Sequence, residues 1–119
     1  MKKTLLLKVD SQDPEIEKIR IAAGFIKNGG LVAFPTETVY GLGADALNPN
    51  AVLALFKAKK RPLDNPPIVH VGSVKKVYKL AKEAPTKAEK LMKSFWPGPL
   101  TLIFKRSEIV PDVTVAGLD

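Results

Sequence analysis

A four-residue apolar run, Leu31 to Phe34, lies between Gly29-Gly30 and Pro35, and it constrains the fold more than any other stretch of the chain. A short apolar run bounded by glycine and proline is typical of a buried strand. The loop that follows, residues 36–43, offers two aliphatic hydroxyls, a carboxylate, a phenol and two glycines. Because α/β proteins often place their chemistry in loops at the ends of strands, this loop is the first candidate for a functional site.

Strand and helix patterns alternate along the rest of the chain. Short apolar runs predict further strands over residues 4–9, 68–71 and 100–104. Apolar residues at helical spacing predict helices over 14–28, 51–58, 74–81 and 86–95, whereas residues 108–119 show no clear element. The residues expected to cap these helices are Asp13, Asn48, Ser73 and Thr86 at N-termini and Gly29 at a C-terminus. This alternation predicts an α/β fold, and the relative direction of the strands stays open.

The composition narrows the classes of partner. The chain has 119 residues, 45% of them hydrophobic, which suits a single domain over residues 1–119 with a modest core. No apolar stretch approaches the roughly 18 residues of a membrane span, so we expect no membrane partner and a cytoplasmic location. With no cysteine and one histidine, neither a disulfide framework nor a zinc site is expected.

The net charge of +7 leaves two interpretations open. A basic balance suits polyanions, either nucleic acid or the phosphates of a nucleotide. The alternative is a lysine-rich surface that keeps the protein soluble.

The basic stretch Lys57 to Arg61 leaves the second predicted helix and is followed by Pro62. Lysines near a helix C-terminus are favoured by the helix dipole, so an ordinary solvated helix end is one interpretation. The functional interpretation rests on Lys59 and Arg61, which are two residues apart and can face the same way in a non-helical exit. Phosphoryl chemistry uses both side chains, because their charges stabilise negative charge on the transferring group.

Two weaker candidates are the hydroxyl-rich loop and a histidine. The loop that begins at Thr36 suits a small polar ligand, but an ordinary turn with capping threonines explains the same residues. His70 lies on the predicted strand 68–71, where a lone histidine is more often structural than part of a site. Phosphate-loop, dinucleotide and nucleophile-elbow motifs are absent from the sequence, which disfavours the common nucleotide folds and serine hydrolases.

Four motifs together resemble the YrdC-type threonylcarbamoyl-AMP synthase family. They are Pro35-Thr36-Glu37-Thr38-Val39-Tyr40-Gly41-Leu42, Lys59-Lys60-Arg61-Pro62 followed by Asn65-Pro66, Ile68-Val69-His70-Val71, and Trp96-Pro97-Gly98-Pro99-Leu100-Thr101. Their order and spacing are similar to the family's over nearly the whole chain. Any one of them alone is weak, but the four in order are highly specific.

The resemblance implies a twisted mixed sheet flanked by helices, around a large positively charged cavity. It also implies a reaction, in which L-threonine and bicarbonate form a carbamate that attacks the α-phosphate of ATP. The products are threonylcarbamoyl-AMP and pyrophosphate, and the adenylate feeds a tRNA modification beside the anticodon, so tRNA or the tRNA-modification machinery is a further partner. Mg2+ would travel with the nucleotide and bridge its phosphate oxygens without a protein-ligand motif.

The resemblance implies roles for particular residues as well. Lys59 and Arg61 match the family's Lys-x-Arg signature, which contacts ATP, and they are the catalytic candidates. Thr36 matches a threonine that binds the L-threonine substrate, and His70 lies where the family lines the same pocket. Asn65 lies on the ATP side of that pocket. No protein side chain is an obvious nucleophile, as expected if the substrate carbamate attacks.

The sequence departs from the family at its C-terminal side, where relatives continue with a threonine, an arginine and a Ser-x-Asn nucleotide loop. We therefore expect a YrdC-like domain truncated on that side, with weak ATP binding and little activity for the chain alone. Three alternatives stay open: a non-catalytic RNA-binding module of the same fold, a carbamoyltransferase-related domain of hydrogenase maturation, and a structural remnant that binds nothing. The absence of acylphosphatase-like and zinc-finger segments disfavours the second.

Overall fold

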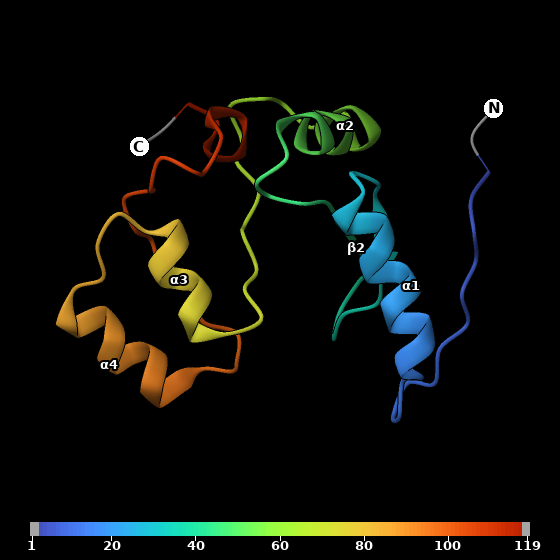
Figure 1. Cartoon of the computed structure of the whole chain (residues 1–119), viewed down its shortest axis with the longest axis horizontal. Helices are drawn as coiled ribbons and strands as arrows, with labels where there is room; N and C mark the ends of the chain where they lie inside the picture. The colour runs from blue at the N-terminus through green and yellow to red at the C-terminus, as the bar shows by residue number, and fades with distance from the viewer. Residues whose placement is uncertain (1–2, 118–119) are drawn as a thin grey trace.

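The computed structural model describes residues 3–117, which contain four α-helices, a two-stranded sheet and a short 3-10 helix. In chain order they are α1 (Ile16–Lys27), β1 (Val32–Phe34), β2 (Gly41–Gly43), α2 (Pro49–Lys59), α3 (Val74–Leu80), α4 (Thr86–Phe95) and the 3-10 helix η1 (Asp112–Val115). Figure 1 shows α1 with the hairpin on one side, α3 with α4 on the other, and α2 and η1 above them. The predicted α/β class is confirmed, and the ends of the predicted domain, 1–2 and 118–119, lie outside the described residues.

β1 and β2 pair as an antiparallel hairpin in which Val32 lies opposite Gly43 and Phe34 opposite Gly41. The Phe34 ring covers both glycines: a Cβ added to Gly43 would lie 2.9 Å from the ring atom Cε1. A side chain at either glycine would therefore push the ring away. The predicted strand 31–34 is confirmed apart from its first residue, and the loop that begins at Thr36 forms the turn of the hairpin.

α1 ends in a Schellman motif, which confirms the predicted C-terminal glycine. Gly29 has a φ of 87°, a left-handed conformation that glycine adopts without a steric penalty. Its N–H donates to the carbonyl oxygen of Ile26 at 3.0 Å, and the N–H of Gly30 donates to that of Phe25 at 2.7 Å. Two helix carbonyls that would otherwise lack partners are thereby satisfied.

The predicted start of α1 is wrong. Glu15, not Asp13, holds the N-cap position, and Pro14 lies before the helix instead of in its first turn. The N–H of Asp13 donates to Asp10 Oδ1 at 3.1 Å, so this residue belongs to a separate turn ahead of the helix. The competing turn is a common use of aspartate and displaces the helix start towards the C-terminus.

α2 begins as predicted, at Asn48 and Pro49. Oδ1 of Asn48 accepts the N–H groups of Asn50 at 3.1 Å and Ala51 at 3.2 Å, and Pro49 stands where no N–H partner is needed. The inner face of the helix buries Ala51, Val52, Leu55 and Phe56. The predicted core positions of this helix are therefore confirmed.

α3 and α4 share a second cluster of buried side chains. Its buried members are Val77, Ala81 and Met92, and Val71, Trp96, Leu102 and Phe104 pack against them.

The capping box predicted at Thr86 is wrong, because Thr86 is already helical and Pro85 holds the N-cap position. The N–H of Glu89 donates to the Pro85 carbonyl at 3.1 Å instead of to a threonine hydroxyl. Ser73 holds the N-cap position of α3, as predicted, but its side chain makes no cap hydrogen bond.

Three predicted strands, residues 4–9, 68–71 and 100–104, do not form in the described part of the chain. A strand exists only where a neighbour pairs its N–H and C=O groups, and none of the three segments has such a neighbour within residues 3–117. Many of their apolar side chains are exposed, reaching 97% for Ile103, although Val71, Leu102 and Phe104 pack against the α3–α4 cluster. The residues after 104 come closest to pairing, through an isolated antiparallel bridge between Ala81 and Arg106.

The expectation of no element after residue 108 is also wrong, because η1 forms there and packs on α2. Thr114, which is 1% exposed, donates its hydroxyl to the carbonyl oxygen of Ala46 at 2.6 Å. Arg106 pairs with Asp112 at 2.6 Å and donates to the Val110 carbonyl at 2.8 Å. Long-range side-chain contacts hold η1, so no local sequence pattern indicates it.

The packing leaves much apolar surface uncovered. The chain exposes 9797 Å², whereas a compact monomer of its mass would expose about 6,300 Å². Its radius of gyration is 15.4 Å, against about 13.5 Å for a compact domain of this length. None of the residues of α1 is buried. No helix in the described range is long and apolar enough to span a membrane.

Candidate functional site

The basic stretch predicted from the sequence lies at the C-terminal end of α2. Lys59 is the last helical residue and Lys60 turns left-handed, with a φ of 53°. The N–H of Lys60 donates to the Lys57 carbonyl at 3.3 Å, and the N–H of Arg61 donates to that of Phe56 at 3.0 Å. This is again a Schellman motif, and it fixes the backbone of Arg61 against a helix whose Phe56 is buried.

The Arg61 side chain folds back onto the loop that follows it. Nε donates to the carbonyl oxygen of Asn65 at 2.8 Å, and Nη2 donates to that of Pro66 at the same distance. The N–H of Asn65 in turn donates to the Pro62 carbonyl at 3.1 Å, which closes a tight turn. Arg61 is half-buried, while Lys59 and Lys60 are exposed. Of the predicted members, Arg61 and Asn65 are thus brought together by one helix end and one loop, and Lys59 lies two residues before Arg61 at the end of the helix.

Thr36 is placed by the hairpin turn. Its hydroxyl donates to the Val39 carbonyl and accepts the N–H of Thr38 at 3.2 Å, and the two threonine Oγ1 atoms are 3.4 Å apart. These bonds close the turn and leave Val39 72% and Tyr40 74% exposed. The Thr36 hydroxyl therefore has a structural role in this turn, whatever ligand the turn binds.

His70 is exposed on the extended segment 68–71, and its Nδ1 lies 3.2 Å from the carbonyl oxygen of Ile68. Among the hydrogen bonds and ion pairs described for residues 3–117, none joins the Thr36 turn to Lys59, Arg61 or His70. Figure 1 draws the turn and the segment after α2 below that helix, on either side of the middle of the molecule. The pocket predicted between Thr36 and Arg61 stays a prediction.

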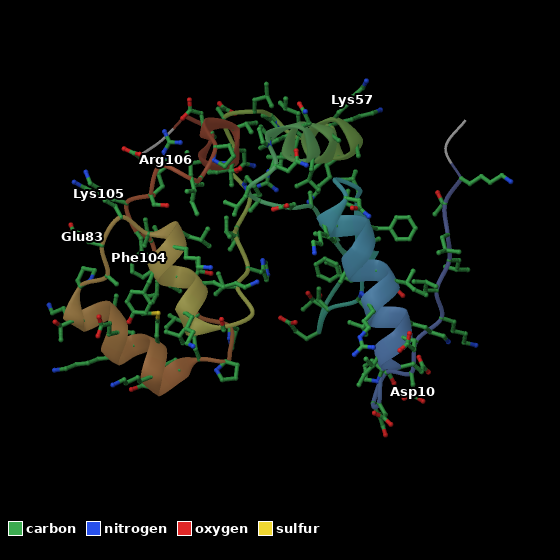
Figure 2. The ribbon with its side chains drawn as sticks, viewed as in Figure 1. Asp10, Lys57, Glu83, Phe104, Lys105 and Arg106 are labelled. Atoms are coloured by element: carbon green, nitrogen blue, oxygen red, sulfur yellow. The ribbon has the colours of Figure 1, made fainter. Side chains whose placement is uncertain are left out.

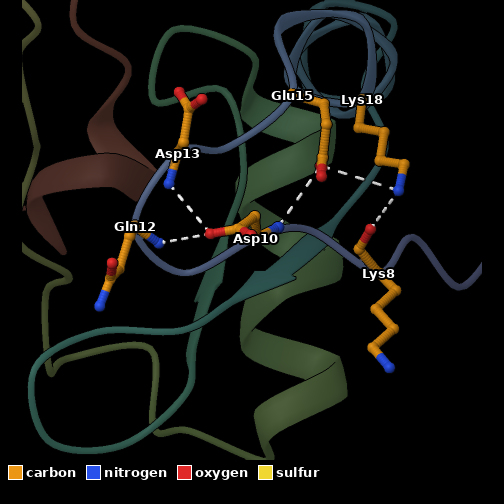
Figure 3. A network of polar contacts seen from close by, with 6 residues as sticks. All are labelled: Lys8, Asp10, Gln12, Asp13, Glu15 and Lys18. Carbon is orange, nitrogen blue, oxygen red and sulfur yellow. Dashed lines mark hydrogen bonds and ion pairs between the residues drawn. The ribbon is translucent and has the colours of Figure 1, made fainter.

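A separate polar cluster precedes α1 (Figure 3). Asp10 Oδ1 accepts the N–H groups of Gln12 at 2.9 Å and Asp13 at 3.1 Å. Glu15 Oε2 accepts the N–H of Asp10 at 3.4 Å and lies 3.7 Å from the Lys18 ammonium, which also donates to the carbonyl of residue 8. The cluster ties the extended segment before α1 to its first turn.

These bonds lower the pKa of both carboxyl groups. The N–H groups of Gln12 and Asp13 hold the pKa of Asp10 below its ordinary value. The pKa of Glu15 is lowered chiefly by its own backbone N–H, and further by the Asp10 N–H and the Lys18 charge. Because both values fall on folding, the cluster favours the folded chain above the ordinary carboxyl pKa and loses that contribution as the pH falls below it.

A groove of mixed charge lies beside the bridge between Ala81 and Arg106, and it is lined by Lys82 and by residues 105–108 and 110–112. Figure 2 shows Lys105 and Arg106 at this edge of the molecule. Its arginine is engaged by Asp112 and the Val110 carbonyl, and none of the predicted site residues lines it. Among residues 3–117 no three His, Cys, Asp or Glu side chains gather into a group able to hold a metal ion.

Comparison with known proteins gives consistent matches. A model of the family of Sua5, YciO and YrdC proteins, described as telomere recombination, matches residues 24–119. The threonylcarbamoyl-AMP synthase of Pyrococcus abyssi is 64% identical over 102 residues, which cover 86% of this chain and 30% of the relative. That of Bacillus subtilis is 49% identical over 113 residues, covering 93% of this chain and 32% of the relative.

Solved structures agree with these matches. The crystal structure of P. abyssi Sua5 complexed with L-threonine has a TM-score of 0.86 and 62% identity, over 90% of this chain and 32% of that one. A solution structure of a Methanobacterium thermoautotrophicum protein has a TM-score of 0.66 and 33% identity, over 97% of this chain and 55% of that one. The chain spans about a third of the length of the curated relatives named above.

Proposed function

The chain belongs to the family of Sua5, YciO and YrdC proteins, and we propose that it is part of a threonylcarbamoyl-AMP synthase. The observation that carries the proposal is its likeness to the P. abyssi protein solved with L-threonine, at 62% identity over 90% of this chain. Two cations at the end of α2 support the binding of ATP. Lys59 is exposed, and Arg61 is half-buried beside the loop that follows the helix.

In the proposed reaction the amino group of L-threonine and bicarbonate form a carbamate with loss of water. A carbamate oxygen attacks the α-phosphorus of ATP, the bond from that phosphorus to the bridging oxygen breaks, and pyrophosphate leaves with the electron pair. Lys59 and Arg61 lower the free energy of this step by offsetting the charge that builds on the phosphate oxygens. Mg2+ enters with the nucleotide, bound to its phosphates.

The other residues of the proposed site act by positioning. Thr36 and His70 hold L-threonine, and Asn65 lies with the cations on the ATP side. Orienting two reactants against each other accelerates a reaction without any protein nucleophile. The adenylate product would then serve the modification of tRNA.

The reaction is tested by joining this chain to the remaining part of the P. abyssi relative and measuring pyrophosphate release from ATP. We expect release that requires both L-threonine and bicarbonate, and little release from this chain alone. Lys59→Ala should lower kcat/KM for ATP about tenfold or more, because it removes one of two charges near the phosphates.

Lys57→Ala is the matched control for this test. Lys57 also lies in the last turn of α2 and is exposed, and Figure 2 shows its side chain pointing away from the body of the molecule. It should leave the rate unchanged. Equal losses in the two variants would contradict the proposal. Micromolar binding of ATP to this chain alone would contradict only the expected weak binding by the chain alone.

A second candidate function, RNA binding without catalysis, is favoured by the distribution of charge. Residues 75–106 contain nine basic and two acidic residues, so they account for the whole net charge of +7. The exposed lysines of this segment are Lys75, Lys76, Lys79, Lys82, Lys87, Lys90, Lys93 and Lys105. In α4 they recur every third residue and so lie on one face of the helix. Such a face suits the phosphates of a polyanion.

If RNA binds to the lysines of α4, replacing these lysines should change the salt dependence of RNA binding more than replacing lysines elsewhere. The affinity for double-stranded RNA falls as salt rises, and a plot of log affinity against log salt has a negative slope. Replacing Lys87, Lys90 and Lys93 by glutamate should make this slope shallower by about 2 to 3. Filter binding at several salt concentrations measures the slope. Glutamates at Lys3, Lys8 and Lys27, which are also exposed, change the net charge equally and should change the slope less. Equal slopes for both triple variants would rule out a specific RNA surface on α4.

A further inference from the structure

Two lysines lie directly opposite each other where the end of α3 pairs with the segment before η1. The antiparallel bridge joins Ala81 to Arg106, so the neighbours Lys82 and Lys105 share the next position of the ladder. The N–H of Lys82 donates to the Lys105 carbonyl at 2.7 Å, in agreement with this register. Directly opposite residues of an antiparallel pair carry their side chains on the same face, with Cβ atoms about 5 Å apart.

The backbone beneath the two lysines is held by the surrounding structure. The N–H of Ser107 donates to the Leu80 carbonyl at 2.7 Å, and its hydroxyl donates to the Lys79 carbonyl. Arg106 is half-buried, and its Nη1 donates to the Val110 carbonyl at 2.8 Å. The fold therefore sets the spacing of the two lysine backbones, although both side chains are exposed.

The two like charges have no counterion among residues 3–117, since none of the ion pairs described there includes Lys82 or Lys105. Both lysines line the groove beside the bridge, and Figure 2 shows Lys105 directed outward at this edge of the molecule. Like charges directly opposite each other destabilise a pair of strands. An anion between the two ammonium groups would replace this repulsion by attraction.

The carboxylates near the groove do not take this place. Asp112 lines the groove, but its Oδ1 lies 2.6 Å from Arg106 Nη2, so that guanidinium offsets its charge. Glu108 also lines the groove, and it is exposed and forms no described ion pair with either lysine. Glu83 is exposed as well and is not one of the lining residues. The groove thus sets two lysines against one exposed carboxylate.

We propose that Lys82 and Lys105 form a binding site for a phosphate group, which lies between their ammonium groups. A phosphate group carries negative charge and several acceptor oxygens, so it can accept from both ammonium groups at once. It comes either from a free polyphosphate or from the backbone of RNA, and the groove, with a volume of about 950 Å³, has room for either. None of the residues proposed to bind ATP lines this groove, so the site does not depend on the proposed reaction.

The first test is a titration of the chain with pyrophosphate at constant ionic strength, followed by NMR at the amides of Lys82, Lys105 and Ser107. We expect these amides to shift and reach saturation. Lys82→Glu should weaken the binding at least about tenfold, because it turns an attracting charge into a repelling one. Lys75→Glu makes the same change at an exposed lysine outside the groove and should weaken it less than about twofold.

A short RNA duplex, titrated into the same three proteins, distinguishes the two sources of phosphate. If pyrophosphate does not saturate the shifts, but Lys82→Glu weakens RNA binding about tenfold and Lys75→Glu does not, the phosphate group belongs to RNA. If neither ligand binds, or if the two variants weaken binding equally, the lysines only add to the general positive charge and the proposal is overturned.

The second test needs no ligand. Because Lys82→Glu places opposite charges across the ladder in place of like charges, it should raise the urea midpoint of the α3–α4 cluster, followed by Trp96 fluorescence. Added salt should reduce this gain, since it screens the charges of exposed side chains. Lys75→Glu should not raise the midpoint. A lower midpoint in Lys82→Glu than in the parent would show that the two lysines do not repel each other and would overturn the proposal.

Discussion

Replacing Met92 by alanine is expected to destabilise the α3–α4 cluster by about 2–5 kcal/mol. Met92 is 1% exposed and forms the buried part of that cluster with Val77 and Ala81. Alanine removes its buried methylene, sulfur and methyl groups and leaves a cavity that the two short helices cannot fill. Urea unfolding followed by the fluorescence of Trp96 measures the loss of stability. Trp96 is the one tryptophan of the chain and packs against this cluster, so its fluorescence reports the unfolding of the cluster.

Ile103→Ala is the control for this prediction. Truncating Ile103 also removes apolar atoms, but this residue is 97% exposed, so the change should alter the free energy of unfolding by less than about 0.5 kcal/mol. Comparable losses in the two variants would mean that the described packing of α3 on α4 is not the packing in solution.

The second large effect is expected at Thr114. Thr114→Val keeps the shape of a side chain that is 1% exposed but removes the hydroxyl that donates to the Ala46 carbonyl at 2.6 Å. This hydrogen bond is part-buried, and its loss should cost about 1 kcal/mol. Far-UV circular dichroism during urea unfolding should show the lower stability, together with faster amide exchange in α2.

Thr101→Val makes the same chemical change at an exposed threonine and should be close to neutral. If Thr114→Val were equally neutral, the hydrogen bond between η1 and the segment before α2 would not contribute to stability. The packing of η1 on α2 would then have to rest on its apolar contacts alone.

The helices could be predicted from the sequence because their signals are local. Asn48 followed by Pro49 and the left-handed Gly29 are caps that act within a few residues, and the structure has both where the sequence indicates them. The failures at Asp13 and Thr86 are also local. At each, a neighbouring group, Asp10 or Pro85, takes the hydrogen bond or the cap position that the pattern assigned to the helix.

The strands could not be predicted in the same way, because a strand is a property of two segments. The runs 4–9, 68–71 and 100–104 have the apolar, β-branched composition of strands. Within residues 3–117 they find no partner, whereas 31–34 finds one across a short turn. The same composition thus gives a strand in one place and an unpaired segment in three others.

The candidate site was only partly accessible from the sequence. The basic stretch after α2 was identified by its charges, and Arg61 lies close to Asn65 in space because the two are four residues apart in the chain. The bonds of Arg61 to backbone carbonyls were missed, since a carbonyl acceptor has no residue type to reveal it. The prolines at 62 and 66 were the available signal, because they stiffen a loop whose carbonyls lack a helix or sheet to pair with.

The contact between Thr114 and Ala46 joins residues that are 68 apart in the chain. On a ribosome that adds roughly 5–20 residues each second, Ala46 would be made roughly 3–14 s before Thr114. Closing so long a loop is also slower than pairing neighbouring helices. We therefore expect the inner face of α2 to stay uncovered in the nascent chain until η1 docks on it.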